Sequence, residues 1–172
     1  MAIGRAVRVG LDGLYRLCGL VAALFLVALL LIILAQIGAR WLGVQFPGST
    51  SYAGYCMAGA SFFALAYTLN HGAHIRVSLF IGQLTGAPRR AAELWCLAIA
   101  AGLAWYFAWY AIKAVRISRL IHDISQGQDA TPLWIPQSFM AMGTVVLAIA
   151  FTDHLVRVLR GGELPGEEAA QE

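Results

Sequence analysis

Charged residues are scarce in this chain of 172 residues. Asp, Glu, Lys and Arg make up only 12% of it, whereas 60% of it is hydrophobic. A typical soluble domain has about a quarter charged residues, and so few charges cannot cover a globule with side chains suited to water. The shortage excludes an ordinary soluble domain and favours a protein whose outer surface faces lipid.

The chain also lacks the motifs of common catalytic and cofactor sites. Its three cysteines, Cys18, Cys56 and Cys96, are isolated, and without a CxxC pair they indicate neither redox chemistry nor zinc binding. No nucleophile elbow, Walker loop or glycine fingerprint is present. The net charge of +3 comes without the run of Lys and Arg that indicates nucleic acid binding. We therefore expect no catalytic residue, no cofactor and no nucleic acid partner.

Histidine gives the only hint of a metal site. His71 and His74 could together clamp a metal, and histidines inside a membrane can bind haem. No second pair of ligands accompanies them, however, and His122 and His154 also lie at or beyond the edges of apolar segments. We expect no metal.

What the chain has instead is long apolar runs, of which the first contains no charged residue from Leu17 to Ala39. At about 1.5 Å per residue this run is roughly 35 Å long, enough to cross a bilayer core of about 30 Å. A secretory signal peptide is the alternative, because Arg5, Arg8 and Arg16 precede the run. The run is longer than the usual apolar region of about 7–15 residues in such peptides, so we expect an uncleaved first transmembrane helix over about 14–40.

Three more spans follow. Pro47 to Thr50 form a turn before a helix over 51–70. A third helix over 91–125 includes an amphipathic extension beyond the bilayer to about Ser125, and Pro136 opens a fourth over 135–158. The expected fold is all-α, with four transmembrane helices and a disordered tail over 161–172.

The segment between spans two and three, beginning at His71, is too short to cross the membrane. As a helix it places Val77, Phe80, Ile81 and Leu84 on one side. This pattern predicts a short helix lying in the headgroup region.

Small residues on the second span predict a helix-packing face. Gly54 and Ala58 have the small-xxx-small spacing that allows two helix backbones to approach closely in lipid.

The distribution of basic residues predicts the orientation. With four spans, eight basic residues share one side with the two termini, and four lie on the other. The first group is Arg5, Arg8, Arg16, Arg76, Arg89, Arg90, Arg157 and Arg160; the second is Arg40, Lys113, Arg116 and Arg119. Both termini are therefore expected in the cytoplasm. Lys113, Arg116 and Arg119 on the outer side either snorkel to lipid headgroups or dock a partner protein.

The middles of the predicted spans contain no ionisable residue. Asp12, Glu93, Asp123 and Asp153 all lie near span ends. A transport site in a membrane usually needs such groups at depth. A small self-assembling exporter would need an embedded carboxylate, and a membrane anchor of a redox complex would need facing histidines; both remain alternatives.

Two segments carry a resemblance to a known family. The residues Gly72-Ala73-His74-Ile75-Arg76-Val77 resemble the stretch after the second helix of the small permeases of TRAP transporters, the DctQ-like subunits. Thr131-Pro132-Leu133-Trp134-Ile135-Pro136-Gln137, with Gly143 further on, is similar to the start of that family's fourth helix. The chain departs from the family before its second helix, where Ser51-Tyr52-Ala53-Gly54 replaces a Trp and acidic residues found in many members.

The resemblance implies a subunit of a tripartite bacterial transporter for organic acids such as dicarboxylates and sialic acids. It implies two protein partners, a large permease subunit driven by a sodium gradient and a periplasmic substrate-binding protein. It also implies an inner-membrane location and a scaffolding role beside the large subunit. The His74-Ile75-Arg76-Val77 motif is the candidate interfacial element.

Overall fold

The computed structural model describes residues 2–70 and 87–160, and it contains four long helices. They are α1 (Ala2–Trp41), α2 (Ser49–Asn70), α4 (Ala87–Leu120) and α5 (Trp134–Leu159). The short interfacial helix, with His74, Ile75, Arg76 and Val77, and the tail over 161–172 lie outside the described residues.

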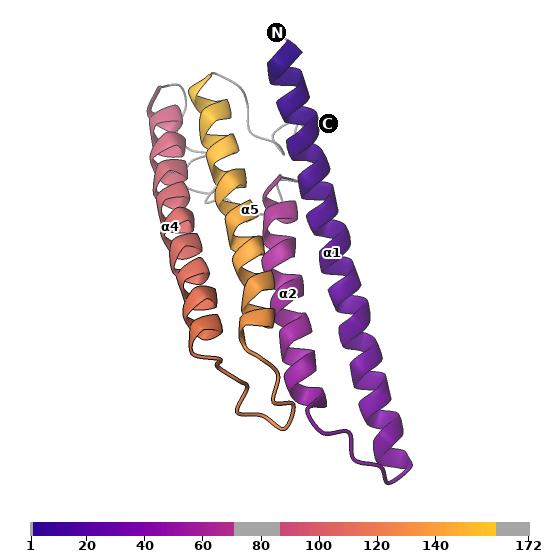
Figure 1. The fold of residues 1–172 in the computed structure, drawn as a ribbon. Coiled ribbons are helices and arrows are strands. Elements are labelled where there is room, and N and C mark those ends of the chain that lie inside the picture. The colour runs from indigo at the N-terminus through magenta and orange to yellow at the C-terminus, as the bar shows by residue number, and fades with distance from the viewer. Residues whose placement is uncertain (1, 71–86, 161–172) are drawn as a thin grey trace.

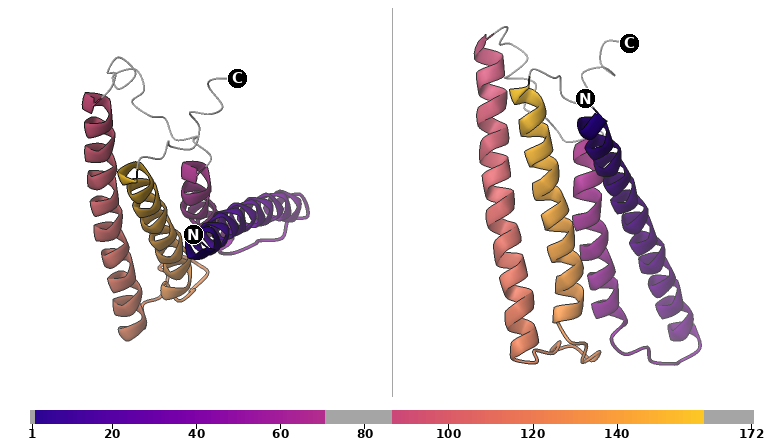
Figure 2. Two further views of the ribbon diagram at one scale, coloured as in Figure 1. Left: turned by 90° about the horizontal axis from the view of Figure 1, so that it is seen from above. Right: turned by 45° about the horizontal axis from the view of Figure 1, so that its top comes forward.

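The four helices lie side by side in the order α4, α5, α2, α1 (Figures 1 and 2). The extensive helix contacts are α4 with α5, α5 with α2, and α2 with α1. The first and last helices of this row are therefore its two edges, and each leaves a broad apolar side exposed. Leu20, Leu24 and Leu31 on α1, and Trp95, Leu103 and Trp109 on α4, are each more than half exposed. Such surfaces suit lipid better than water.

The path of the chain places the helix ends in two groups. The beginnings of α1 and α4 and the ends of α2 and α5 lie at one end of the row (Figure 1). The turn over 42–48 and the loop over 121–133 lie at the opposite end, which we call the outer end. Helices α2 and α5 consequently run parallel, and α1 and α4 run against them.

Aromatic rings and small residues join α1, α2 and α5. Phe25 of α1 stacks on Phe63 of α2 with ring centroids 6.1 Å apart, and it meets Phe139 of α5 edge-on at 5.3 Å. The same Phe25 ring lies against Gly59 of α2. Nearer the other end, Tyr15 is buried with Leu69 and Ala150. These contacts fix α2 between its two neighbours along most of its length.

Buried alanines lie on both α4 and α5, which pack against each other. Ala101, Ala104 and Ala108 of α4 are buried at helical spacing, as are Ala141 and Ala148 of α5. Short side chains let the two backbones approach closely, which is how helices gain packing energy where lipid removes the hydrophobic drive.

Gly143 of α5 lies close to the α2 backbone. A Cβ built on Gly143 would lie 2.8 Å from Cβ of Phe62 and 2.9 Å from its carbonyl carbon. The Phe62 ring in turn stacks on Phe107 of α4 at 6.1 Å. The small size of Gly143 therefore lets α5 contact α2 at Phe62, the same residue whose ring contacts α4.

Two helices end in the same hydrogen-bonded motif. At the end of α1, Gly43 has φ +69° and the Val44 N–H donates to the Ala39 carbonyl at 2.9 Å. At the end of α4, His122 has φ 53° and the Asp123 N–H donates to the Ser118 carbonyl at 2.9 Å. This is the 6→1 bond of a Schellman motif, which caps the last carbonyls of a helix.

The cap at His122 corrects one expectation. The apolar periodicity predicts a helix to about Ser125, but α4 ends at Leu120. His122 occupies the left-handed position that glycine usually takes, a conformation that periodicity does not reveal. Helix α1 also begins at Ala2, well before the expected position near residue 14.

Three described helical segments are long and apolar enough to cross a membrane: Arg8–Trp41, Pro88–Leu120 and Trp134–Leu159. Helix α2 is not among them. Its sequence interrupts the apolar residues with Ser, Thr, Tyr and Gly, so its own composition does not mark it as a span.

Candidate interaction surfaces

The loop over 121–133 is a folded element. The Ser125 N–H donates to the Thr131 carbonyl at 2.8 Å, and the Leu133 N–H donates to the Asp123 carbonyl at 3.0 Å. Ile124 and Pro132 form an isolated antiparallel bridge between these two bonds. The second family-like motif thus begins in the returning arm of a hairpin-like loop and continues into α5.

Asp129 ties this loop to α2. Its Oδ2 accepts a hydrogen bond from the Tyr55 hydroxyl at 3.0 Å, and its Oδ1 accepts one from the Ser125 hydroxyl at 2.9 Å. Partial desolvation acts to raise the pKa of the Asp129 carboxyl, but hydrogen bonds from Thr131, Ser125 and Tyr55 outweigh it and hold that pKa well below its usual range. The carboxylate is therefore charged at any physiological pH.

Close packing accompanies these bonds. A Cβ on Gly48, which has φ +77°, would lie 2.8 Å from Cβ of Asp129. A Cβ on Gly127 would lie 2.7 Å from the Ser51 hydroxyl oxygen. The loop therefore rests directly on the first turn of α2 and the turn before it.

The three basic residues singled out by sequence lie on the last turns of α4, at the outer end. Lys113, Arg116 and Arg119 are all exposed. The Lys113 Nζ lies 5.8 Å from the Tyr110 ring centroid, and the Arg119 Cζ lies 5.6 Å from the Trp134 ring centroid. Both distances fit cation–π contacts. Because Trp134 begins α5, the Arg119 contact joins the basic patch to the end of the folded loop.

The predicted packing face of α2 points away from the other described helices. Gly54 is exposed, and a Cβ built on it would meet nothing within 4 Å. Ala58 is half-buried. Within the described residues the close glycine contacts of the helices are made elsewhere, by Gly19, Gly59 and Gly143. Among the described residues, therefore, nothing packs closely on Gly54.

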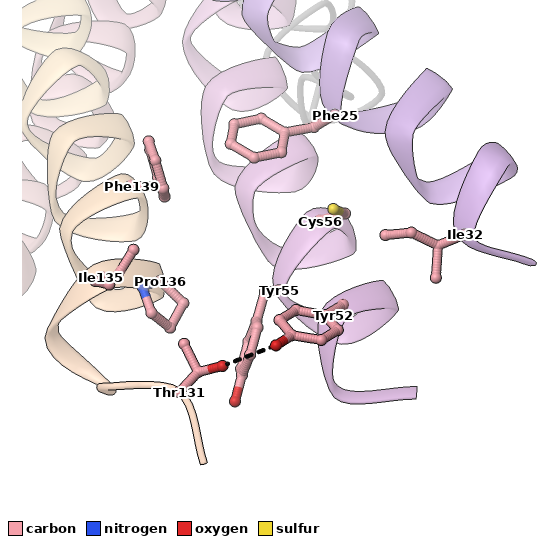
Figure 3. A pocket seen from close by; sticks show the side chains of 9 residues that line it. All are labelled: Phe25, Ile32, Tyr52, Tyr55, Cys56, Thr131, Ile135, Pro136 and Phe139. Atoms are coloured by element: carbon pink, nitrogen blue, oxygen red, sulfur yellow. Dashed lines mark hydrogen bonds between the residues drawn. The ribbon is translucent and has the colours of Figure 1, made fainter. Parts of the chain in front are cut away.

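A cavity of about 280 Å³ lies between α1, α2 and α5 near the outer end (Figure 3). Figure 3 shows Phe25, Ile32 and Phe139 around it, with the hydroxyls of Tyr52 and Thr131 meeting at its rim, 3.5 Å apart. Its lining residues are Phe25, Ile32, Tyr52, Tyr55, Cys56, Thr131, Ile135, Pro136 and Phe139. None carries a basic side chain, so the cavity offers nothing to neutralise an organic anion.

The middle of each described helix contains no charged residue; in α1 the uncharged stretch lies between Arg16 and Arg40. Helix α2 contains none of Asp, Glu, Lys, Arg and His. In α4 the uncharged stretch runs from Leu94 to Ile112, and in α5 the first charged residue is Asp153. Across residues 2–70 and 87–160, no three His, Cys, Asp or Glu side chains gather in a way that could hold a metal ion.

Sequence reasoning missed Asp129 as a structural residue. It interprets the segment as a polar loop, since Gln, Gly, Asp and Thr crowd there. The partner hydroxyl of Tyr55 is 74 positions away, and only the fold brings the two together.

The long apolar helices and their uncharged middles define an all-helical membrane protein. The comparison with family models identifies which one. Residues 29–161 match the model of the DctQ component of tripartite ATP-independent periplasmic transporters. This match covers most of the chain, which therefore belongs to that family, as its two motifs indicate. The protein is a transporter component, the small permease subunit, and not an enzyme. No curated protein matches the chain.

Proposed function

We propose that this subunit is a static scaffold for the large permease subunit during sodium-coupled uptake of an organic acid, such as a dicarboxylate. The two form a heterodimer in the bacterial inner membrane, and a periplasmic binding protein delivers the substrate. The observation that carries this proposal is the uncharged middle of every described helix, because a site for a charged substrate at that depth needs ionisable groups or broken helices.

The proposal includes four spans. Helix α2 packs between α1 and α5, with Gly19 of α1 against the Tyr67 ring near one end and Phe25 against Gly59 further along. If α1 and α5 cross the bilayer, α2 crosses with them, and its modest apolar character is compensated by neighbours that shield it from lipid.

The proposed orientation places both termini in the cytoplasm and the outer end in the periplasm. The basic residues concentrate at the end that holds Arg8, Arg16, Arg89, Arg90 and Arg157. Reporter fusions at Phe46 and Gln128 should be active only in the periplasm, and fusions at Pro88 and the C-terminus only in the cytoplasm. Periplasmic activity at Pro88 would rule out the four-span arrangement.

The scaffold role is tested by reconstitution. Proteoliposomes that contain both permease subunits, supplied with the binding protein and a sodium gradient, should take up the organic acid. Vesicles with the small subunit alone should show no flux, and calorimetry should detect neither sodium nor substrate binding to it. Flux through the isolated subunit would instead favour a small self-assembling exporter.

We also propose that Lys113, Arg116 and Arg119 form a periplasmic docking patch for the binding protein. All three are exposed at the outer end, where the positive-inside rule leaves few cations. Changing Arg116 and Arg119 to Glu should slow association by about tenfold at low salt, with a smaller effect at high salt, because long-range steering is screened. Binding kinetics on the assembled heterodimer would measure this. Unchanged kinetics would show that the patch only anchors α4 at the headgroups.

A further inference from the structure

The folded loop over 121–133 is held to α2 by one set of side chains, which we call the outer latch: Asp129, Tyr55 and Ser125. The Asp129 Oδ1 accepts a hydrogen bond from the Ser125 hydroxyl within the loop, and the Oδ2 accepts one from the Tyr55 hydroxyl of α2. A carboxylate that accepts hydrogen bonds forms stronger ones than a neutral acceptor does. The latch therefore joins the α4–α5 loop to the α1–α2 side of the molecule.

The basic patch is attached to the same loop at both of the loop's ends. The loop begins immediately after Leu120, the last residue of α4, and the final turn of α4 carries Arg119. It ends at Leu133, next to the Trp134 ring on which Arg119 lies. A change in the loop's conformation would therefore act on the residues at both ends of the Arg119–Trp134 contact.

The strained backbone in the loop shows why a latch is needed. His122 and Ala130 both have positive φ, at 53° and 46°, and such conformations are costly for residues other than glycine. Ala130 directly follows Asp129, so the Asp129 hydrogen bonds and the close packing on Gly48 hold the strained position in place. Without these hydrogen bonds and this packing, the loop would lower its energy by leaving the positive-φ conformation at Ala130.

We infer that the outer latch is a positioning device: it holds the 121–133 loop in the one conformation that the binding protein recognises, so that docking depends on Asp129 and Tyr55 as well as on the basic patch. The inference rests on the proposed docking function. Its physical basis is preorganisation, because a partner binds only the fraction of molecules whose loop is already folded.

An effect of charge alone and an effect of the latch predict opposite changes in docking affinity when Asp129 is replaced by Ala. If only charge mattered, removing a negative group from the outer end would strengthen the attraction of an acidic partner to the basic patch. If the latch matters, Asp129→Ala unfolds the loop and weakens docking. Tyr55→Phe also distinguishes the charge explanation from the latch explanation. It removes one hydrogen bond and changes no charge, so only the latch predicts weaker docking.

The experiment uses the full-length subunit in its heterodimer, placed in lipid nanodiscs, with the periplasmic binding protein as the probe. We expect Asp129→Ala to weaken binding by about tenfold, corresponding to a competent fraction near one in ten. We expect Tyr55→Phe to weaken it by several-fold. In Tyr55→Phe, which changes no charge, the dependence of the association rate on salt should stay as in the wild type, because Lys113, Arg116 and Arg119 remain. Amide exchange of Ser125 and Leu133 should accelerate while the helix amides keep their protection.

Tyr52→Phe is the matched control. Tyr52 lies three residues before Tyr55 on the same helix. Its hydroxyl meets the loop at the Thr131 hydroxyl, and the 3.5 Å between the two oxygens is too long for a strong hydrogen bond. It should leave docking within about twofold of the wild type. An Asp129→Ala heterodimer that docks as well as or better than the wild type overturns the inference.

Changing Arg116 and Arg119 to Glu tests the docking function of the basic patch separately from the positioning role of the outer latch. If reversal weakens docking and the latch variants do not, the patch is a docking surface and the latch does not position it. If neither set of variants changes docking to an assembled heterodimer, the docking function of this surface fails, and the latch inference fails with it.

Discussion

Changing Gly143 to Ala is expected to lower the stability of the folded subunit by about 1–3 kcal/mol, and changing it to Leu to prevent folding. The added Cβ would lie 2.8 Å from Cβ of Phe62 and 2.9–3.0 Å from the carbonyl carbon and oxygen of the same residue. The last two are backbone atoms of α2, which cannot rotate away as a flexible side chain can. The two helices must therefore separate, which loosens the contacts made by the Phe62 ring with Phe107 as well. Thermal unfolding of the purified subunit in detergent would measure the loss.

Gly102→Ala provides the matched control for Gly143→Ala. Gly102 lies within α4 and is exposed, and a Cβ built on it meets nothing within 4 Å. Alanine there should be neutral or stabilising by up to about 1 kcal/mol, because glycine is a poor helix former. Equal unfolding temperatures for the Gly143→Ala and Gly102→Ala proteins would contradict the close α2–α5 contact.

The helices could be predicted from sequence because their signals are local. Charge-free apolar runs and flanking prolines and glycines locate each helix within a few residues at most ends. The exceptions are the start of α1, which extends back to Ala2, and the end of α4. At the end of α4, Ile121 and Ile124 continue the apolar stripe, although the left-handed conformation of His122 has already ended the helix. Side-chain periodicity records which face is apolar, and it does not record a single left-handed residue.

The arrangement of the helices in a row could not be predicted in the same way. Small residues occur on every described helix, and sequence alone does not say which of them face a neighbour. Gly54 and Ala58 have the packing spacing, yet the glycines in contact with neighbouring helices are Gly19, Gly59 and Gly143. Their contacts are with aromatic rings and with backbone, and no spacing rule within one helix predicts these.

The contact predicted from the Gly54–Ala58 spacing remains a prediction, and it concerns the outward face of α2. Gly54 and Met57 are exposed there, and the exposed Ser61 hydroxyl is already bonded to the Met57 carbonyl at 2.9 Å. A surface of small residues and satisfied hydroxyls allows another helix to approach closely. Helix α2 is also the one described helix that lacks the apolar composition of a span, which fits a helix covered by protein on several sides.

We therefore expect Gly54→Leu to disrupt the heterodimer while leaving the subunit itself folded. A Cβ built on Gly54 meets nothing within 4 Å among the described residues, so leucine there should fit without a clash against the other helices. It would, however, hold a partner helix away from the α2 backbone. Overpacking a helix contact costs about 1–3 kcal/mol, which corresponds to a loss of roughly 5- to 150-fold in association. Copurification of the large subunit through a tag on the small subunit would measure this loss of association. Ala58→Leu is expected to act in the same direction.

Gly102→Leu is the matched control, since Gly102 is equally open but lies on α4. If both leucine variants at 54 and 102 copurify like the wild type, the α2 face contacts lipid; if only Gly102→Leu disrupts the pair, the large subunit binds along α4 instead.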